Sequence, residues 1–307
     1  MIKLIVPKLE EQEKIIAVML RLLQDGMRAR EAATLLEEGQ VSLGRFFKKK
    51  AEKEMDLFGG EQITIGGLKR EEDYLARSMK APVYEDESFA IWNKPAGLRT
   101  ISNARDGLAT VYSIATEYMQ KMHEYDADTL RVPYICYRLE KEIGGLVIVA
   151  KSQWPFENML LALKERRVKR FAKVIVTGEP QEEAALQGYL LLQKKTPARI
   201  VKEPMRGARP CALRYKTLER KEALALLEVE LLTAYPGQMV LQLAAAGLPV
   251  LGDTANGSKK NNRAYHVYKE AVWADRILFE TGRSNSLEYL NGKSVQAETV
   301  YLPKIGL

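Results

Sequence analysis

The sequence predicts an α+β fold in two parts, a small domain over residues 1–67 and a large domain over residues 82–307. Three observations predict it. Two helical patterns and a short hairpin pattern open the chain, and a charged stretch at residues 68–81 follows them as a linker. After Pro82 the pattern changes to many short β segments, with helices between only some of them. This irregular alternation predicts a mixed or antiparallel sheet and argues against a doubly wound nucleotide-binding fold.

The small domain is predicted from periodicity. Apolar residues recur at helical spacing over residues 10–37, and Gly26 interrupts the stripe. Gly39 ends the second helix. Gly59-Gly60 predicts a turn before residues 62–65, which alternate as a short strand does. Two helices and a small hairpin therefore make up a unit of about 60 residues.

The large domain is predicted from short apolar segments separated by turn residues. Helices are expected at residues 109–118 and 156–167. The clearest strands are expected at residues 83–84, 89–92, 146–149 and 173–176, and further strands at residues 226–232 and 239–243. No run of about 18 apolar residues occurs, so no membrane partner or membrane span is expected.

The composition limits the classes of function. The 307 residues are 46% hydrophobic and carry a net charge of +7, which favours a polyanionic partner. Two cysteines, Cys136 and Cys211, and two histidines, His123 and His266, lack the spacing of metal ligands. The apolar run at the amino terminus is too short for a signal peptide. These features predict a reduced, cytoplasmic protein without a bound metal.

Four sequence blocks carry a family resemblance. They are YEDE and NKPAG within residues 84–97, YRLEKEIGGL at residues 137–146, KRF at residues 169–171, and TAYPGQMV with GLPVLGD within residues 233–253. In this order and spacing they resemble the signature of RluA-type pseudouridine synthases. The resemblance implies the α+β catalytic domain of that family, with its mixed or antiparallel sheet. The first 67 residues resemble a degenerate S4 domain, the small α/β RNA-binding appendage that is common in the family.

The resemblance also implies a reaction and the residues that perform it. In the family an aspartate attacks a flipped-out uridine, a tyrosine packs against the base, and an arginine pairs with the aspartate, without a cofactor. The matching positions here are Glu140, Phe171 and Val240. A misplacement of about 1 Å in a reacting group costs on the order of a hundredfold in rate. The three replacements together predict weak or lost uridine isomerase activity.

The partner that the resemblance implies is structured RNA, either ribosomal or transfer RNA, bound by a monomer. Basic runs at residues 48–50, 164–170 and 206–214 favour an RNA-facing surface, because phosphate contacts dominate such affinity. The residues expected to contact RNA are Arg138, Lys94, Lys141, Tyr235, Gln238, Lys169 and Arg170.

Three alternatives stay open at this point. The basic residues could be ordinary solvated charge on exposed faces. Glu140 could do the work of the aspartate in an active synthase. The ancestral pocket could also hold a small molecule or a protein partner, and an absence of RNA binding even at low salt would favour that possibility.

Overall fold

The structure is a computed structural model that describes residues 2–7, 9, 11–24, 26–44, 48–66, 71–102, 108–193 and 196–297. The chain divides into two compact units. Within the described residues, the first unit comprises the chain up to Phe156 together with Ala264–Val267, and the second comprises Glu157–Arg263 and the residues from Tyr268 onward. This division differs from the predicted boundary at residues 67–82. Each unit is described by itself below.

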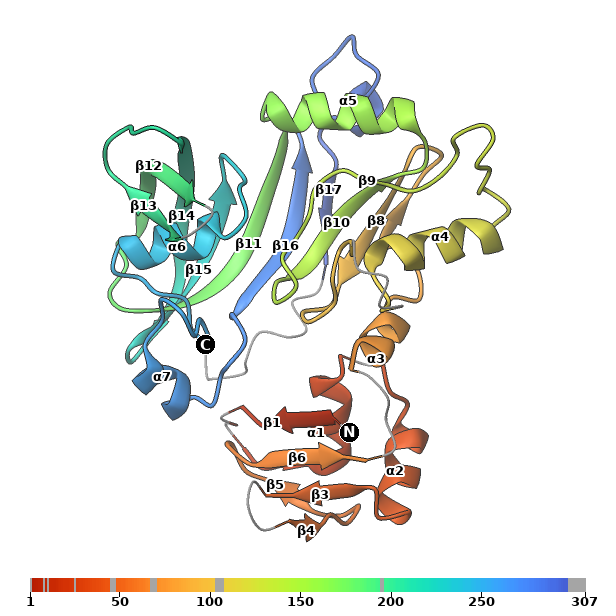
Figure 1. Ribbon diagram of the computed structural model, residues 1–307, viewed down its shortest axis with the longest axis vertical. Coiled ribbons are helices and arrows are strands. Elements are labelled where there is room, and N and C mark those ends of the chain that lie inside the picture. The colour runs from red at the N-terminus through yellow and green to blue at the C-terminus, as the bar shows by residue number, and fades with distance from the viewer. Residues whose placement is uncertain are drawn as a thin grey trace. The chain divides into compact units, whose positions relative to one another are not determined.

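The amino-terminal part of the first unit contains a small antiparallel sheet and three helices (Figure 1). Its sheet has the strand order β1-β6-β3-β4, and β2 pairs with β5 separately. The helices α1 and α2 confirm the predicted helical stripe and its interruption at Gly26. The elements are β1 (Ile2–Ile5), β2 (Glu13–Lys14), α1 (Ile15–Leu22), α2 (Ala29–Glu37), β3 (Val41–Leu43), β4 (Lys49–Lys50), β5 (Asp56–Leu57), β6 (Gln62–Ile65) and α3 (Glu71–Ser78).

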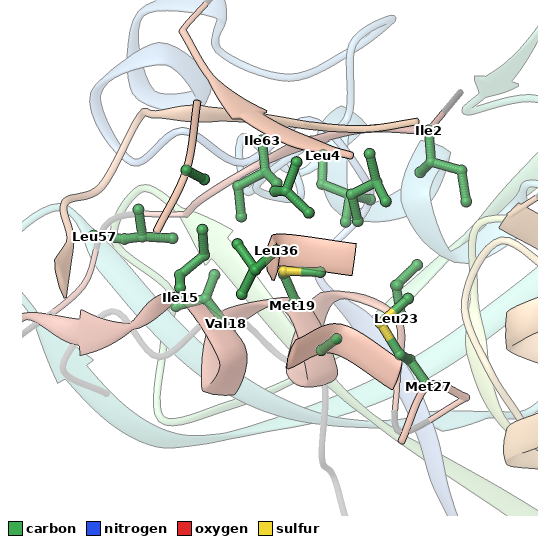
Figure 2. Packing of buried hydrophobic residues seen from close by; sticks show 14 of the residues in the cluster. Ile2, Leu4, Ile15, Val18, Met19, Leu23, Met27, Leu36, Leu57 and Ile63 are labelled. Atoms are coloured by element: carbon green, nitrogen blue, oxygen red, sulfur yellow. The ribbon is translucent and has the colours of Figure 1, made fainter. Parts of the chain in front are cut away.

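Apolar side chains of these helices and strands form one core, part of which is drawn in Figure 2. Ile15, Val18 and Met19 on α1 are fully buried, because their spacing places them on one face of the helix. Tyr74 of α3 belongs to the same cluster. The segment predicted as a linker therefore contains a helix with a buried face; residues 68–70 of that segment lie outside the described residues.

The remainder of the first unit has an antiparallel arrangement in which β10 pairs with β8 and β9, and β8 pairs with β7. All of β10 is buried, as its unbroken apolar sequence predicts. Thr110 caps α4 through a reciprocal capping box with Ser113. The elements are β7 (Tyr84–Glu85), β8 (Phe89–Lys94), α4 (Val111–Lys121), β9 (Tyr134–Ile135) and β10 (Gly144–Ala150).

The second unit contains long antiparallel strands in the order β13-β12-β14-β15-β11-β16, with β17 paired to β16. Helix α6 contacts β12 and β13. Helix α5 (Gln153–Lys164) crosses the boundary between the units. The other elements are β11 (Val168–Thr177), β12 (Glu183–Gln193), β13 (Thr196–Val201), β14 (Ala208–Lys221), β15 (Leu224–Leu231), α6 (Gln238–Ala245), α7 (Lys259–Ala264), β16 (Val272–Phe279), a 3₁₀ turn (Glu288–Leu290) and β17 (Ser294–Gln296).

One predicted strand is wrong. Residues 239–243, which the apolar pattern assigned to a strand, lie in α6. Gly237 adopts a left-handed conformation with φ of 70° immediately before the helix, which turns the chain into it. A short apolar run does not distinguish a buried strand from a buried helix, and here the helix is observed.

The α+β class predicted from the sequence is confirmed, because helices and mainly antiparallel strands occur in both units. In the part of the chain that the structure describes, no helix is long and apolar enough to cross a membrane. Cys136 and Cys211 are both buried free thiols.

Candidate functional site

Glu140 lies in the loop between β9 and β10, and hydrogen bonds fix both of its neighbours. Thr100 Oγ1 donates to the Leu139 carbonyl at 2.7 Å, and the Leu139 amide donates back to this hydroxyl at 3.2 Å. The Lys141 carbonyl accepts from the Gly97 amide at 2.7 Å. Glu140 itself is half-buried. The loop that carries the Glu140 carboxylate is therefore hydrogen-bonded to the loop after β8 on both sides of Glu140.

Lys94 ends β8 beneath this loop and is fully buried. Burial lowers the pKa of Lys94 to about 7, although the negative charges of Glu142 and Glu140 act to raise it. The RNA contact expected for Lys94 does not fit this placement, because its ammonium is bound inside the protein. Its Nζ donates to three main-chain oxygens, those of Leu98 at 2.8 Å, Pro95 at 3.2 Å and Lys141 at 3.3 Å.

Arg138 and Lys141 flank the same loop and reach the surface. Arg138 is exposed, and the side chain of Lys141 is 41% exposed while its Nζ pairs with Glu72 of α3 at 3.2 Å. Pairs of this kind at the surface stabilise weakly, so Lys141 can exchange its partner at little cost. Both residues are sterically available to a phosphate group.

Phe171 lies on β11 of the second unit, and a guanidinium covers its ring. Strand β16 places Arg276 directly opposite Phe171 in the register. The guanidinium carbon of Arg276 lies 3.7 Å from the ring centroid, and its Nη2 pairs with Glu228 at 2.7 Å. A cation over an aromatic face is attracted by the ring, and the carboxylate of Glu228 holds it there. One face of the Phe171 ring is therefore occupied.

A groove of about 360 Å³ opens beside Phe171 on this sheet. Arg214 pairs with Glu230 and Lys216 with Glu183, each at 3.6 Å. Three carboxylates face two cations along the lining, so the groove offers no excess of positive charge to a polyanion. Its charged lining comes from β12, β14 and β15 and consists of Glu183, Arg214, Lys216, Glu228 and Glu230.

Val240 and Gln238 both lie in α6 and point into the protein. Val240 is 5% exposed and supplies no cation. Gln238 is buried and donates through its Nε2 to Gln242 Oε1 at 2.7 Å and to the Ala212 carbonyl at 3.2 Å. Its Oε1 accepts from the Tyr235 amide at 3.1 Å. The amide of Gln238 therefore holds the start of α6, and the expected RNA contact does not fit its burial.

Three other residues expected to contact RNA lie nearer the surface. Lys169 pairs with Glu280 at 2.7 Å, and Arg170 is half-buried on the same strand. Tyr235 is half-buried before α6, and the exposed Arg209 lies over its ring, with the guanidinium carbon 5.7 Å from the centroid. Arg209 belongs to one of the basic runs noted in the sequence. The pair offers a cation and an aromatic ring side by side.

No sequence pattern predicted a role for Arg276 or Glu228. The available signal was the pair Asp275-Arg276 within an otherwise apolar strand. Asp275 is 1% exposed, and its burial raises the pKa of its carboxyl, against the charge of Lys173. Its Oδ2 lies 3.6 Å from Lys173 Nζ. Charged residues inside a strand indicate a polar face of the sheet. That Arg276 covers the ring of Phe171 follows only from the pairing register of β11 and β16.

Glu140 belongs to the first unit, whereas Phe171 and Val240 belong to the second. Within the first unit the structure places Lys94 near Glu140, although the two residues are 46 positions apart in the sequence. Lys94 donates a hydrogen bond to the carbonyl of Lys141, the residue after Glu140, and the charge of Glu140 acts on Lys94. Among the described residues, no group of three or more histidine, cysteine, aspartate or glutamate side chains could hold a metal ion.

Known proteins share both the sequence pattern and the fold. A family model described as RNA pseudouridylate synthase matches residues 88–245. The chain is 27% identical over 259 residues to the ribosomal large subunit pseudouridine synthase D of Neisseria meningitidis serogroup A, covering 83% of this chain and 66% of that relative. It is 24% identical over 256 residues to the ribosomal large subunit pseudouridine synthase C of Vibrio parahaemolyticus, covering 80% of this chain and 75% of the relative.

A solved structure supports the fold. The human RNA pseudouridylate synthase domain containing 4 aligns with a TM-score of 0.59 at 16% identity, over 75% of this chain and 92% of that chain. Its likeness concerns the fold alone. The family match covers more than half of the residues and includes most of the blocks that carry the sequence resemblance. The chain therefore belongs to the RNA pseudouridylate synthase family, as an RluA-type member.

Proposed function

We propose that this chain binds structured RNA, ribosomal or transfer RNA, and that it has weak or no uridine isomerase activity. Family membership and the net charge of +7 support RNA as the partner. Relatives of similar sequence are named for the ribosomal large subunit. In this proposal the first 67 residues act as an S4-like RNA-binding domain, and the protein works as a monomer in the cytoplasm.

The contact of Arg276 with Phe171 carries the proposed loss of activity. The family resemblance implies an aromatic ring that packs against the target base at this position. Here the guanidinium lies 3.7 Å from the ring centroid and is anchored by Glu228. A base that used this face would have to displace the cation and break its ion pair. Such a displacement adds to the binding cost of every uridine.

The other two replaced positions add to this loss. Glu140 places its carboxyl one methylene farther from the main chain, and its loop is held at Leu139 and Lys141. The held loop limits how far the backbone can move to compensate. Val240 is apolar and buried, so it provides no arginine to pair with a carboxylate. When residues cooperate in one catalytic step, the effects of replacing them on the rate are not additive, and the loss of any one of them can abolish most of the activity.

One observation favours a second candidate, an active synthase that uses Glu140. The buried ammonium of Lys94 lies within electrostatic range of Glu140, as its effect on the pKa of Lys94 shows. In this candidate Lys94 takes the place of the arginine as the basic partner of the carboxylate. This cation stands in a different part of the sequence from the arginine that the family resemblance implies.

A product assay decides between these two candidates. Purified protein is incubated with total RNA from a source that lacks the gene, and new pseudouridine is measured. We expect little or no product from the wild type, and a gain on the order of a hundredfold from Glu140→Asp, which restores the shorter side chain. Glu142→Asp is the matched control, because it makes the same change two residues away, and it should leave the yield unchanged.

One outcome would change the assignment, and another would locate the lesion beyond Glu140. Abundant product from the wild type that Glu140→Gln removes would establish the active synthase and overturn the proposed loss. Product from neither protein, with salt-dependent RNA binding retained, is expected if Arg276 and Val240 also block the reaction. The double variant Glu140→Asp with Arg276→Leu then tests the covered ring directly.

RNA binding itself is tested by a substitution on β14, at the exposed Arg209. Replacing Arg209 by glutamine should weaken RNA affinity and reduce the slope of log K against log salt by about one. Arg214→Gln is the matched control on the same strand, because the Arg214 guanidinium already lies 3.6 Å from Glu230 in the groove. Filter binding over a range of salt concentrations measures both. Equal effects of the two substitutions would contradict the assigned surface, and no binding at low salt would favour a protein or small-molecule partner.

A further inference from the structure

Gln24 has an unusual position two residues beyond the end of α1, directly after the C-cap Leu23. It is a polar residue with only 5% of its surface exposed, and its φ of 52° lies in the left-handed region. Residues other than glycine adopt this region rarely. Where they do, the surrounding structure holds them in place, and such positions often have a function.

The side-chain amide of Gln24 pairs with both main-chain groups of Ala96. Its Nε2 donates to the Ala96 carbonyl at 2.8 Å, and the Ala96 amide donates to its Oε1 at 3.0 Å. The two residues are 72 positions apart in the chain. A planar amide that satisfies the donor and the acceptor of one residue fixes both the position and the orientation of that residue. Ala96 follows Lys94 in the loop after β8.

The hydrogen bonds continue from this loop to Glu140. The Gly97 amide, next to Ala96, donates to the Lys141 carbonyl at 2.7 Å. Lys94 Nζ reaches the same carbonyl at 3.3 Å. Lys141 is the covalent neighbour of Glu140. Gln24 is therefore linked to the Glu140 loop through one short loop and two sets of hydrogen bonds, all within the first unit.

We propose that Gln24 is a positioning residue that orders the loop carrying Glu140 by clamping Ala96. Through this clamp, the position of the amino-terminal helices sets how tightly the Glu140 loop is held. The inference rests on the proposed function only for the importance of Glu140. Its test requires neither RNA nor turnover. The test can therefore contradict the clamp while the proposed function holds, and the proposed function can fail while the clamp holds.

Two substitutions separate the clamp from simple filling of space. Gln24→Asn keeps an amide and tolerates the left-handed region well, but it is one methylene too short to reach Ala96. Gln24→Glu keeps the length of the side chain. Its ionised carboxylate accepts from the Ala96 amide but has no proton for the Ala96 carbonyl, whereas its protonated form is shaped like glutamine and donates there.

Hydrogen exchange of the full chain, read by mass spectrometry, measures the clamp in peptides over residues 94–101 and 137–145. These contain the Gly97 amide and the Ile143 amide, which donates to the Glu140 carbonyl at 3.2 Å. Gln24→Asn should raise their exchange about tenfold, as expected for the loss of two buried hydrogen bonds. Peptides over Ile15–Leu22 and Val168–Thr177 should keep their rates.

The glutamate variant supplies a readout that packing alone does not give. Compared with the wild type at each pH, Gln24→Glu should protect both peptides equally well at low pH and lose that protection as its carboxyl ionises. The wild type contains every other titrating group, so the ratio of the exchange rates of Gln24→Glu and wild type at each pH reports the ionisation of residue 24 alone. Gln238→Asn, which shortens a buried glutamine of the second unit, is the control and should not affect these peptides.

Three results would overturn the proposal. They are unchanged exchange at Gly97 and Ile143 in Gln24→Asn, faster exchange across the whole first unit, and a Gln24→Glu ratio that does not vary with pH. The second result would show that Gln24 serves only the stability of the fold.

Discussion

Replacing Gly26 by alanine is expected to lower the free energy of unfolding by more than about 3 kcal/mol, at the upper end for overpacking. An alanine Cβ at this position would lie 1.7 Å from the carbonyl oxygen of Tyr74 and 2.4 Å from its carbon. Both are main-chain atoms of α3, so no flexible side chain can move aside. Helix α3 would have to shift, and Tyr74 would leave the core of the amino-terminal helices and strands.

Urea denaturation followed by circular dichroism measures this effect. Gly247→Ala is the control, because Gly247 has a φ of 77° and no atom within 4 Å of the added Cβ. There the substitution costs only the left-handed conformation, about 1–2 kcal/mol. Similar losses for both variants would contradict the steric explanation. The comparison separates a close approach of two segments from a need for glycine at positive φ.

Replacing Lys94 by methionine is expected to remove a rise of stability with pH. Burial lowers the pKa of Lys94 to about 7, from an ordinary value of 10.5. Between these values the unfolded chain holds a proton that the folded protein has released. The free energy of unfolding therefore rises with pH in this interval, by up to about 1.4 kcal/mol per pH unit, and Lys94 adds no slope below about pH 7.

The difference between wild type and Lys94→Met should thus change by about 1 kcal/mol between pH 7.5 and 8.5. Lys151→Met is the matched control. Burial acts to lower the pKa of Lys151, but its bonds to Glu124 and Glu85 outweigh this and raise the pKa. Lys151 is therefore protonated in both states over this interval and contributes no slope. A parallel pH dependence for wild type and Lys94→Met would show that Lys94 stays charged in the folded protein.

Much of the fold was predictable because local patterns and packing agree. The stripe broken at Gly26 and the unbroken apolar run of β10 specify their elements without help from distant residues. The failures lie where tertiary contacts decide. Residues 239–243 became helical because α6 packs its buried face on β12 and β13. Strand β12 was missed, since its half-exposed pattern resembles that of a surface segment.

The candidate site shows the same division. The block that contains Glu140 and the NKPAG loop could be located from sequence, because each is a continuous motif. The burial of Lys94 could not, since it depends on three carbonyl groups that meet only when the two loops pack. Arg276 covers Phe171 because β11 and β16 pair in one register. Sequence spacing does not determine a register between strands so far apart.

The pairing of β11 has a consequence for the nascent chain. β11 bonds to β15 along one edge and to β16 along the other. Translation at about 5–20 residues per second leaves on the order of 5–20 s between the synthesis of β11 and of β16. During that time the edge formed by Val168–Val174 has no β16 to pair with and is open to aggregation or to a chaperone. The biosynthesis of this protein therefore includes an interval of several seconds in which one edge of β11 stays unpaired.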